Sequence, residues 1–221
     1  MGEGYTVMKN FTLLTNPVVR NIGLKLHHKD TESYDYREYT RLLGLYMGID
    51  LSGRNILPTK KIICRTPLGL LKTEIIDDNK IGIVNVLRAG TNMALGMGEA
   101  FPKSCISFIS AWRRQEGNTI IADTDYNRGI EDLDKKVVII TDPALASGFS
   151  ILACIDVIYK KVEPKKIIIC CLHAATKGIK NITKEYSNID IYSVFGPSDL
   201  NEKFYIINGP GDCGDRSFNT K

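Results

Sequence analysis

Four short apolar runs constrain the fold of this chain more than any other feature. They are IGIVNVL at 81–87, CISFIS at 105–110, KVVIIT at 136–141 and KIIICCL at 166–172. The runs lack the apolar–polar alternation of a strand with one wet face, so we expect strands buried on both faces. Helical stretches of about a dozen residues, the length of a crossover connection, separate some of them. The sequence therefore predicts an α/β fold with a central, mostly parallel sheet flanked by helices.

Other stretches predict the elements around this sheet. Residues 189–195 would add a fifth strand after a helix near 178–187. A helix over 32–51 is indicated by residues at helical spacing, namely Tyr36, Tyr39, Leu42, Leu43 and Tyr46. Residues 60–76 are typical of a strand, a Thr-Pro-Leu-Gly turn and a second strand. The polar stretch 112–134 is too long for an ordinary connection and indicates an active-site flap in the form of a β-hairpin.

The composition is that of an ordinary globular domain. Of the 221 residues, 43% are hydrophobic, which is enough to form a large buried core. The charged residues make up 24%. We expect a single domain over residues 1–221, in which residues 1–14 form a flexible N-terminal extension. The net charge of +4 is too small for a nucleic-acid footprint but suits anionic small molecules.

Cysteine and histidine spacing argues against the common structural metal sites. The six cysteines form no CxxC pair, and the three histidines have no zinc-ligand spacing. We interpret the cysteines as reduced, buried apolar residues, which are typical of an intracellular protein. No stretch reaches the roughly 18 apolar residues of a membrane span. A cytoplasmic protein that contacts neither membrane nor nucleic acid is therefore expected.

The stretch DPALASGFS at 142–150 is the first candidate for a binding site. It follows the apolar run at 136–141 directly and precedes a helical pattern, ILACIDVIYKK. Small side chains let backbone N–H groups approach an anion, and a helix N-terminus adds partial positive charge. The motif is neither a Walker loop nor GxGxxG. A phosphate cradle and an ordinary capped helix remain equal alternatives on this stretch alone.

Two more stretches carry chemistry at the same predicted edge. In LRAG at 87–90, a guanidinium follows a buried strand, which suits an oxyanion ligand or else a surface ion pair. The tail YIINGPGDCGDRSFNT at 205–220 has little helical or strand pattern after Ile207. Its three glycines and one proline within six residues indicate a special backbone shape rather than a frayed end.

Taken together, these motifs resemble the uracil phosphoribosyltransferase family. The stretches TPLG, LRAG, DPALASG and the tail follow one another in the family's order, and the resemblance covers roughly residues 15–220. It implies a phosphoribosyltransferase-like core with a hood from the C-terminal tail. It also implies transfer of the phosphoribosyl group of 5-phosphoribosyl 1-diphosphate (PRPP) to uracil, which gives UMP and diphosphate. Such enzymes use Mg²⁺ carried by PRPP, are homodimers or larger, and in some members respond to a purine nucleotide such as GTP.

The resemblance also implies site residues, which it carries over position by position. Catalytic roles would fall to Arg88, Asp142 and Asp212. PRPP would be bound by these three and by Arg113, Pro143, Ala144, Leu145, Ala146, Ser147, Gly148, Phe149 and Ser150. Uracil would be bound by the tail residues Tyr205, Ile206, Gly211, Asp212 and Cys213.

The chain departs from the family pattern at several positions. Phe149 stands where a Gly is common in the phosphate loop, and Asn208 stands where a Pro is usual beside the base. Two alternatives therefore stay open. One is a nucleotide- or PRPP-sensing regulator on the same fold, and the other is a transferase for a different base.

Overall fold

An eight-stranded sheet forms the centre of the structure. The computed structural model describes the backbone of residues 10–116 and 119–220, and their side chains except those of 112–123. The strand order is β1-β12-β11-β9-β4-β5-β8, and β10 pairs with β11. Neighbouring strands run parallel except β8, which is antiparallel to β5. The strands are β1 (Phe11–Leu13), β4 (Ile81–Leu87), β5 (Cys105–Ser110), β8 (Asn127–Arg128), β9 (Val137–Thr141), β10 (Ala144–Leu145), β11 (Lys166–Ala175) and β12 (Asp190–Ser198).

The five predicted strands are all present, and the α/β class is confirmed. Strands β4, β9 and β11 are buried along nearly their whole length, as expected for strands covered on both faces. The predicted N-terminal extension is too long, because Phe11–Leu13 pairs in parallel with β12 and Leu14 is fully buried. Its first nine residues lie outside the described part of the chain.

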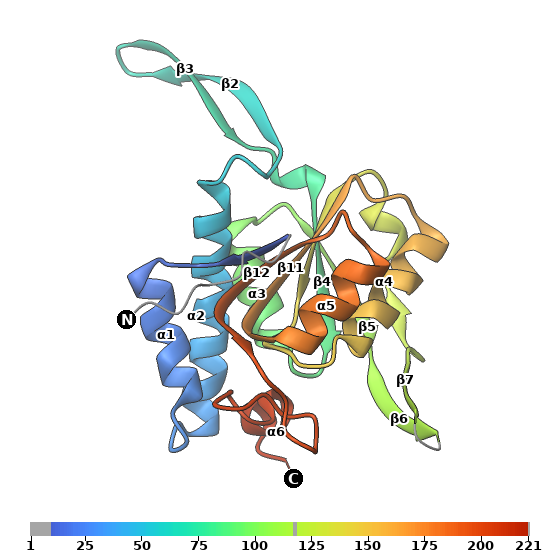
Figure 1. The fold of residues 1–221 in the computed structure, drawn as a ribbon. Helices are drawn as coiled ribbons and strands as arrows, with labels where there is room; N and C mark the ends of the chain where they lie inside the picture. The colour runs from blue at the N-terminus through green and yellow to red at the C-terminus, as the bar shows by residue number, and fades with distance from the viewer. Residues whose placement is uncertain (1–9, 117–118, 221) are drawn as a thin grey trace.

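Helices cover both faces of the sheet in a three-layer arrangement (Figure 1). Helices α1 (Pro17–His27), α2 (Ser33–Ser52) and α3 (Thr91–Ala100) pack on one face, and α4 (Phe149–Lys161) and α5 (Thr176–Glu185) pack on the other. Asn16 starts α1, because its side chain accepts a hydrogen bond from the Val18 amide at 3.0 Å and Pro17 follows it. Helix α2 confirms the helix predicted over 32–51.

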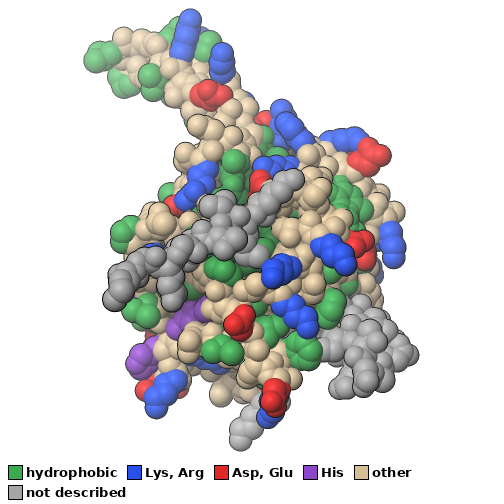
Figure 2. Space-filling view, in the orientation of Figure 1, with side chains coloured by type: hydrophobic (Ala, Val, Ile, Leu, Met, Phe, Trp, Pro, Cys, Tyr) green, Lys and Arg blue, Asp and Glu red, His purple; other side chains and the backbone are tan. Residues whose placement is uncertain are grey.

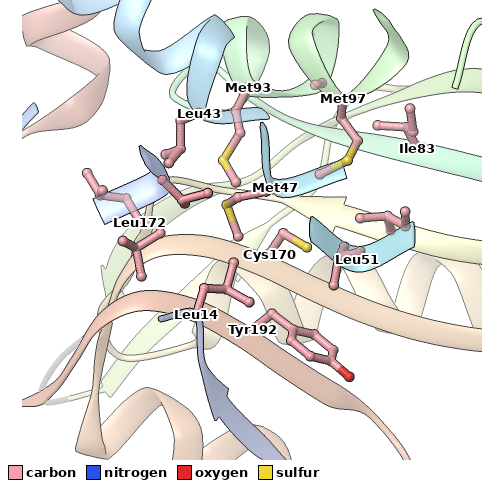
Figure 3. Close-up of a cluster of buried hydrophobic side chains, with 14 of the residues drawn as sticks. Leu14, Leu43, Met47, Leu51, Ile83, Met93, Met97, Cys170, Leu172 and Tyr192 are labelled. Carbon is pink, nitrogen blue, oxygen red and sulfur yellow. The ribbon is translucent and has the colours of Figure 1, made fainter. Parts of the chain in front are cut away.

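The larger core lies between the sheet and the first three helices (Figure 3). Leu43, Met47 and Leu51 lie on one face of α2, and Met93 and Met97 of α3 meet them there. Two glycines let these helices touch. A Cβ atom on Gly44 would lie 2.0 Å from the Met93 carbonyl oxygen, and one on Gly96 would lie 1.8 Å from that of Arg41. The close contact fixes α3, and with it the turn that precedes α3.

Two hairpins leave the body of the molecule. Strands β2 (Thr59–Thr66) and β3 (Gly69–Ile76) form the predicted first hairpin, which projects into solvent at one end (Figure 1). Strands β6 (Trp112–Glu116) and β7 (Thr119–Asp123) form the second, at the predicted flap. The flap is shorter than the predicted 112–134, because Asn127–Arg128 returns to the sheet as β8 and Glu131–Leu133 forms a 3₁₀ turn, η2. A further 3₁₀ turn, η1 (Asp78–Lys80), precedes β4.

The C-terminal tail is more ordered than its sequence predicts. After an irregular stretch, Cys213–Phe218 forms a short helix, α6, at the end of the molecule opposite the first hairpin (Figure 1). The Asp212 carboxylate caps α6 by accepting a hydrogen bond from the Asp215 amide at 2.9 Å. Among the described helices, none is long and apolar enough to cross a membrane.

Candidate active site

The stretch from Asp142 to Ser150, called here the phosphate loop, connects β9 to α4. Residues of this loop line a small cup of about 30 Å³, namely Asp142, Ala144, Leu145, Ala146, Ser147, Gly148 and Ser150. Asp142 turns back on the loop, because its Oδ1 accepts a hydrogen bond from the Ala144 amide at 3.2 Å. Helix α5 supports the cup from outside, where Asn181 Nδ2 donates to the Ser147 carbonyl at 3.0 Å. The loop therefore forms a cup lined mainly by small side chains and supported by α5.

The N-terminus of α4 opens onto this cradle. Gly148 precedes the helix with φ 83°, a left-handed conformation that favours glycine, and as the N-cap residue it has no side chain with which to cap the first turn. The helix N–H groups are thus left for a ligand, which favours a phosphate cradle over an ordinary capped helix. Phe149 is the first residue of α4 and is not among the residues with positive φ, so its backbone does not need a glycine.

Arg88 follows β4 on a turn that leads into α3. The peptide bond between Leu87 and Arg88 is cis. The guanidinium is more than half exposed; its Nη2 lies 3.0 Å from Asp215 Oδ1, and its Nη1 donates to Thr220 Oγ1 at 3.2 Å. Neither partner was assigned a role from the sequence. The strand-end arginine is therefore tied to the C-terminal tail, 127 residues further along the chain.

Residues 199–212, called here the hood loop, lie over the same edge of the sheet. An antiparallel bridge joins Leu200 to Ile206 across a tight turn, and Ile206 packs against Ala146 of the phosphate loop. Arg216 of α6 holds the base of this loop. Its guanidinium donates to the backbone carbonyls of Leu26 and His28 at 2.6 Å and of Pro210 at 2.7 Å, and lies 4.4 Å from the ring centroid of Tyr36.

A cavity of about 200 Å³ joins these three segments. Its lining brings together ten of the residues expected from the sequence: Arg88, Asp142, Ala144, Ala146, Ser150, Tyr205, Ile206, Gly211, Asp212 and Cys213. Leu145, Ser147 and Gly148 line the adjoining cup, while Pro143 is buried behind it, where its carbonyl accepts from the Leu172 amide at 3.0 Å. The side chain of Arg113 lies outside the described residues.

One residue of the cavity lining, Cys213, carries a buried titratable group. Burial raises the pKa of the Cys213 thiol to about 12, so the thiol is neutral and acts as an apolar group.

A pair of histidines, His27 and His173, lies behind the hood loop. His27 Nδ1 lies 2.8 Å from the Gly23 carbonyl oxygen and must donate to it. His27 Nε2 therefore accepts a hydrogen bond from His173 Nδ1 at 2.8 Å. His173 Nε2 then accepts from the Ser198 hydroxyl, also at 2.8 Å. Burial, with the neighbouring His27, lowers the pKa of His173 to about 4.

The sequence has counterparts among known proteins. A family model described as uracil phosphoribosyltransferase matches residues 13–220, nearly the whole chain. The chain belongs to the uracil phosphoribosyltransferase family. A uracil phosphoribosyltransferase of Dictyoglomus turgidum is 35% identical over 209 residues, which cover 95% of this chain and 99% of that protein. One of Ralstonia pickettii is 32% identical over 213 residues and covers 96% of each chain.

Solved structures confirm the fold assigned to this family member. The AQ2163 protein from Aquifex aeolicus superposes with a TM-score of 0.84 and 27% identity, covering 94% of this chain and 97% of that one. An adenine phosphoribosyltransferase from Trypanosoma brucei superposes with a TM-score of 0.52 at 11% identity, covering 86% and 85%. The latter likeness concerns the fold alone.

Proposed function

We propose that this protein transfers the 5-phosphoribosyl group of PRPP to uracil, forming UMP and diphosphate. The supporting observation is the single cavity that joins the phosphate loop, Arg88 and the hood loop in a member of the uracil phosphoribosyltransferase family. An anion cradle, an arginine and a wall of backbone groups are the three recognition elements that a phosphorylated sugar and a planar base require. The activity belongs to pyrimidine salvage.

In this proposal the phosphate loop binds the 5-phosphate of PRPP. The N–H groups at the start of α4, with the hydroxyls of Ser147 and Ser150, would donate to the phosphate oxygens. Asp142 lies at the rim shared by the cup and the cavity, where its carboxylate would accept hydrogen bonds from the ribose hydroxyls. The sugar is thus held at both ends before the base enters.

The chemical step separates charge, and the proposed residues stabilise both parts. Breaking the bond to diphosphate builds positive charge on the ribose ring and negative charge on the leaving group. Arg88 would donate to the leaving diphosphate, and the carboxylates of Asp142 and Asp212 would face the positive ring. The β6–β7 hairpin would exclude water from the ring, which water would otherwise attack.

Backbone groups would select uracil in the hood loop. Uracil presents one N–H between two carbonyls on the edge away from the sugar. Tyr205, Ile206 and Gly211 line the cavity, and the backbone N–H and C=O groups of Ile206 and Gly211 suit that edge without a charged side chain. Cys213 is buried beside them as a neutral thiol.

We propose Mg²⁺ as the cofactor, brought by PRPP rather than held by the protein alone. Within the described residues, no group of three or more His, Cys, Asp or Glu side chains is arranged to hold a metal ion. The carboxylates of Asp142 and Asp212 in the cavity are oxygen donors of the kind that Mg²⁺ prefers, so they fit a metal shared with the diphosphate. When bound, Mg²⁺ would neutralise charge on the leaving group.

We further propose a cytoplasmic homodimer or larger homo-oligomer that a purine nucleotide such as GTP activates. The projecting β2–β3 hairpin favours self-association, because it carries exposed apolar side chains over its length (Figure 2), namely Ile63, Leu68, Leu70 and Leu71. Neither nucleic acid nor membrane is a partner in this proposal.

A base screen tests the proposed activity directly. The purified protein is incubated with PRPP, Mg²⁺ and one base at a time, and nucleotide formation is followed by chromatography. Uracil and 5-fluorouracil should react. Cytosine, adenine and hypoxanthine should not, since a mismatched edge leaves buried groups unpaired at about 1–3 kcal/mol each. Orotate keeps the edge of uracil but adds a charged carboxylate to the ring, which is costly to desolvate, so it should not react either. Equal turnover of a purine base would reject the assignment.

A further inference from the structure

Phe204 of the hood loop has a backbone conformation that aromatic residues rarely adopt. Its φ is 61°, in the left-handed region. Among the described residues, six other than glycine have positive φ, and four of these are asparagines, which tolerate this region. Phe204 is the aromatic exception. A bulky side chain at such a position marks a site where the surrounding structure, and often function, requires it.

The local turn explains why the conformation is imposed. The Phe204 amide donates to the Asn201 carbonyl at 2.9 Å, and the Asn201 amide donates to the Tyr205 carbonyl at 2.9 Å. The Asn201 side chain further accepts from the amides of Lys203 and Tyr205 at 3.0 Å each. A turn closed in this way places a left-handed residue before the returning strand, a position that glycine fills best. The chain therefore has a phenylalanine where the backbone alone favours glycine.

Phe204 also belongs to the lining of the cavity. It lines the same 200 Å³ space as Arg88, Asp142 and Asp212, beside Tyr205 and Ile206. The ring is also held from α5, because Lys177 Nζ lies 4.7 Å from its centroid. Lys177 stands next to Gly178, which packs so tightly on the phosphate loop that a Cβ there would lie 2.5 Å from the Ala146 carbonyl oxygen. The Phe204 ring therefore connects the hood loop to α5, the helix that supports the phosphate loop.

We propose that Phe204 is a base-binding residue whose ring forms an apolar wall for the pyrimidine base, and that Lys177 is a positioning residue that holds this ring. The inference rests on the proposed uracil transfer. Its physical basis is that an aromatic ring gives a planar base a large contact surface independent of the hydrogen-bonding edge. Backbone groups would then select the edge of the base, and Phe204 would contribute affinity.

The variant Phe204→Gly tests this role, because glycine suits the left-handed backbone and removes only the ring. We expect the KM for uracil to rise at least about fivefold, the lower end for loss of one base–aromatic contact, with the KM for PRPP within about twofold of wild type. Phe204→Tyr keeps an aromatic ring, so its KM for uracil should equal that of the wild type. Lys203→Gly, an exposed neighbour in the same turn, controls for added flexibility and should leave both constants unchanged. Phe204→Asn replaces Phe204→Gly if the latter does not fold.

The role of Lys177 is tested in the same assay. Lys177→Met should raise the uracil KM in the wild-type background but not in the Phe204→Gly background, because it acts through the ring. If the wild-type protein does not turn over uracil, the proposed function itself is rejected. With an active wild type, a folded Phe204 variant whose uracil KM is unchanged, or whose uracil and PRPP KM values rise equally, overturns the inference. Equal Lys177 effects in both backgrounds overturn the positioning role.

Discussion

At the scale of single residues, the site combines groups that the sequence places far apart. Arg88 and Asp142 were singled out because each follows a buried strand at the predicted ligand edge, and their roles were implied by the resemblance to the family. The pairing of Arg88 with Asp215 was not predictable, since a carboxylate in an irregular tail has no periodic pattern that locates it. Asn208 shows a real departure from the family pattern, because its φ of 58° is one that the usual proline cannot adopt.

Substitution of Arg88 should separate catalysis from stability. Arg88→Ala should lower kcat/KM at least tenfold, or about 1.4 kcal/mol of transition-state stabilisation, because it removes the donor to the leaving diphosphate. Its melting temperature should change little, since the pair with Asp215 is partly exposed. The comparison variant Asp215→Asn breaks the ion pair but keeps the guanidinium, so it should retain more activity. Wild-type kinetics in Arg88→Ala would contradict the assigned role.

Asp142 gives an independent test in the phosphate loop. Asp142→Ala should fold yet lose at least tenfold in activity, or about 1.4 kcal/mol, because no carboxylate would then meet the ribose hydroxyls. Steady-state kinetics and thermal unfolding of the same preparation measure the two effects. Full activity in a variant with a normal melting temperature would show that the sugar is held elsewhere.

The His27–His173 pair should make stability depend on pH. The folded pKa of His173, about 4, lies below the ordinary value of 6.5, so the unfolded chain binds the proton more readily. This contribution is fully present above about pH 6.5 and is lost as the pH falls towards 4, by about 1–2 kcal/mol. Melting temperatures between pH 7.5 and 5 should therefore fall less in His173→Gln than in wild type. His28→Gln, outside the pair, should behave as wild type; an equal fall in all three would refute the pair's contribution.

At the scale of elements, apolar strands and amphipathic helices were predictable and irregular segments were not. Runs of apolar residues in the sequence are enough to identify five strands, namely β4, β5, β9, β11 and β12. Strand β1 has three residues and α6 has six, so both are too short for an apolar period to repeat recognisably. The phosphate loop and the hood loop were located only through their motifs, because their shapes depend on contacts with α5 and with the α1–α2 connection.

Arg216 is the main anchor of the C-terminal element. Arg216→Met removes three hydrogen bonds to carbonyls and should lower the free energy of unfolding by about 2–3 kcal/mol, while raising the KM for uracil more than that for PRPP. Arg216→Lys keeps the charge but lacks the planar fork, so it should recover only part of both losses. Chemical denaturation and steady-state kinetics provide the measurements. Unchanged stability in Arg216→Met would show that the tail is held by other contacts.

At the scale of the whole molecule, the central sheet follows from the sequence, whereas the proposed assembly does not. The β2–β3 hairpin is predictable as a hairpin, but only the structure shows that it projects from the body (Figure 1) and that several of its apolar side chains are exposed. Such a surface is costly for a monomer and suits an interface. Leu68 is fully exposed at the tip, and Leu70 is about two-thirds exposed.

The hairpin should control the oligomeric state. The double variant Leu68→Asp/Leu70→Asp should sediment as a monomer at concentrations where the wild type is a dimer or larger, because charges on an apolar interface are expensive to bury. Lys61→Asp, on the same hairpin but without loss of an apolar side chain, should assemble as wild type. An unchanged sedimentation coefficient in the double variant would place the interface elsewhere.

The central claim is that one cavity binds PRPP and uracil and transfers the phosphoribosyl group between them. The stoichiometry of the two products tests this claim most directly. Wild-type protein is incubated with PRPP, Mg²⁺ and labelled uracil, and UMP and diphosphate are quantified in the same samples over time. The account predicts that the two products appear in equal amounts, that neither forms without uracil, and that Arg88→Ala slows both equally. Diphosphate released without UMP, or UMP formation unaffected in Arg88→Ala, would contradict it.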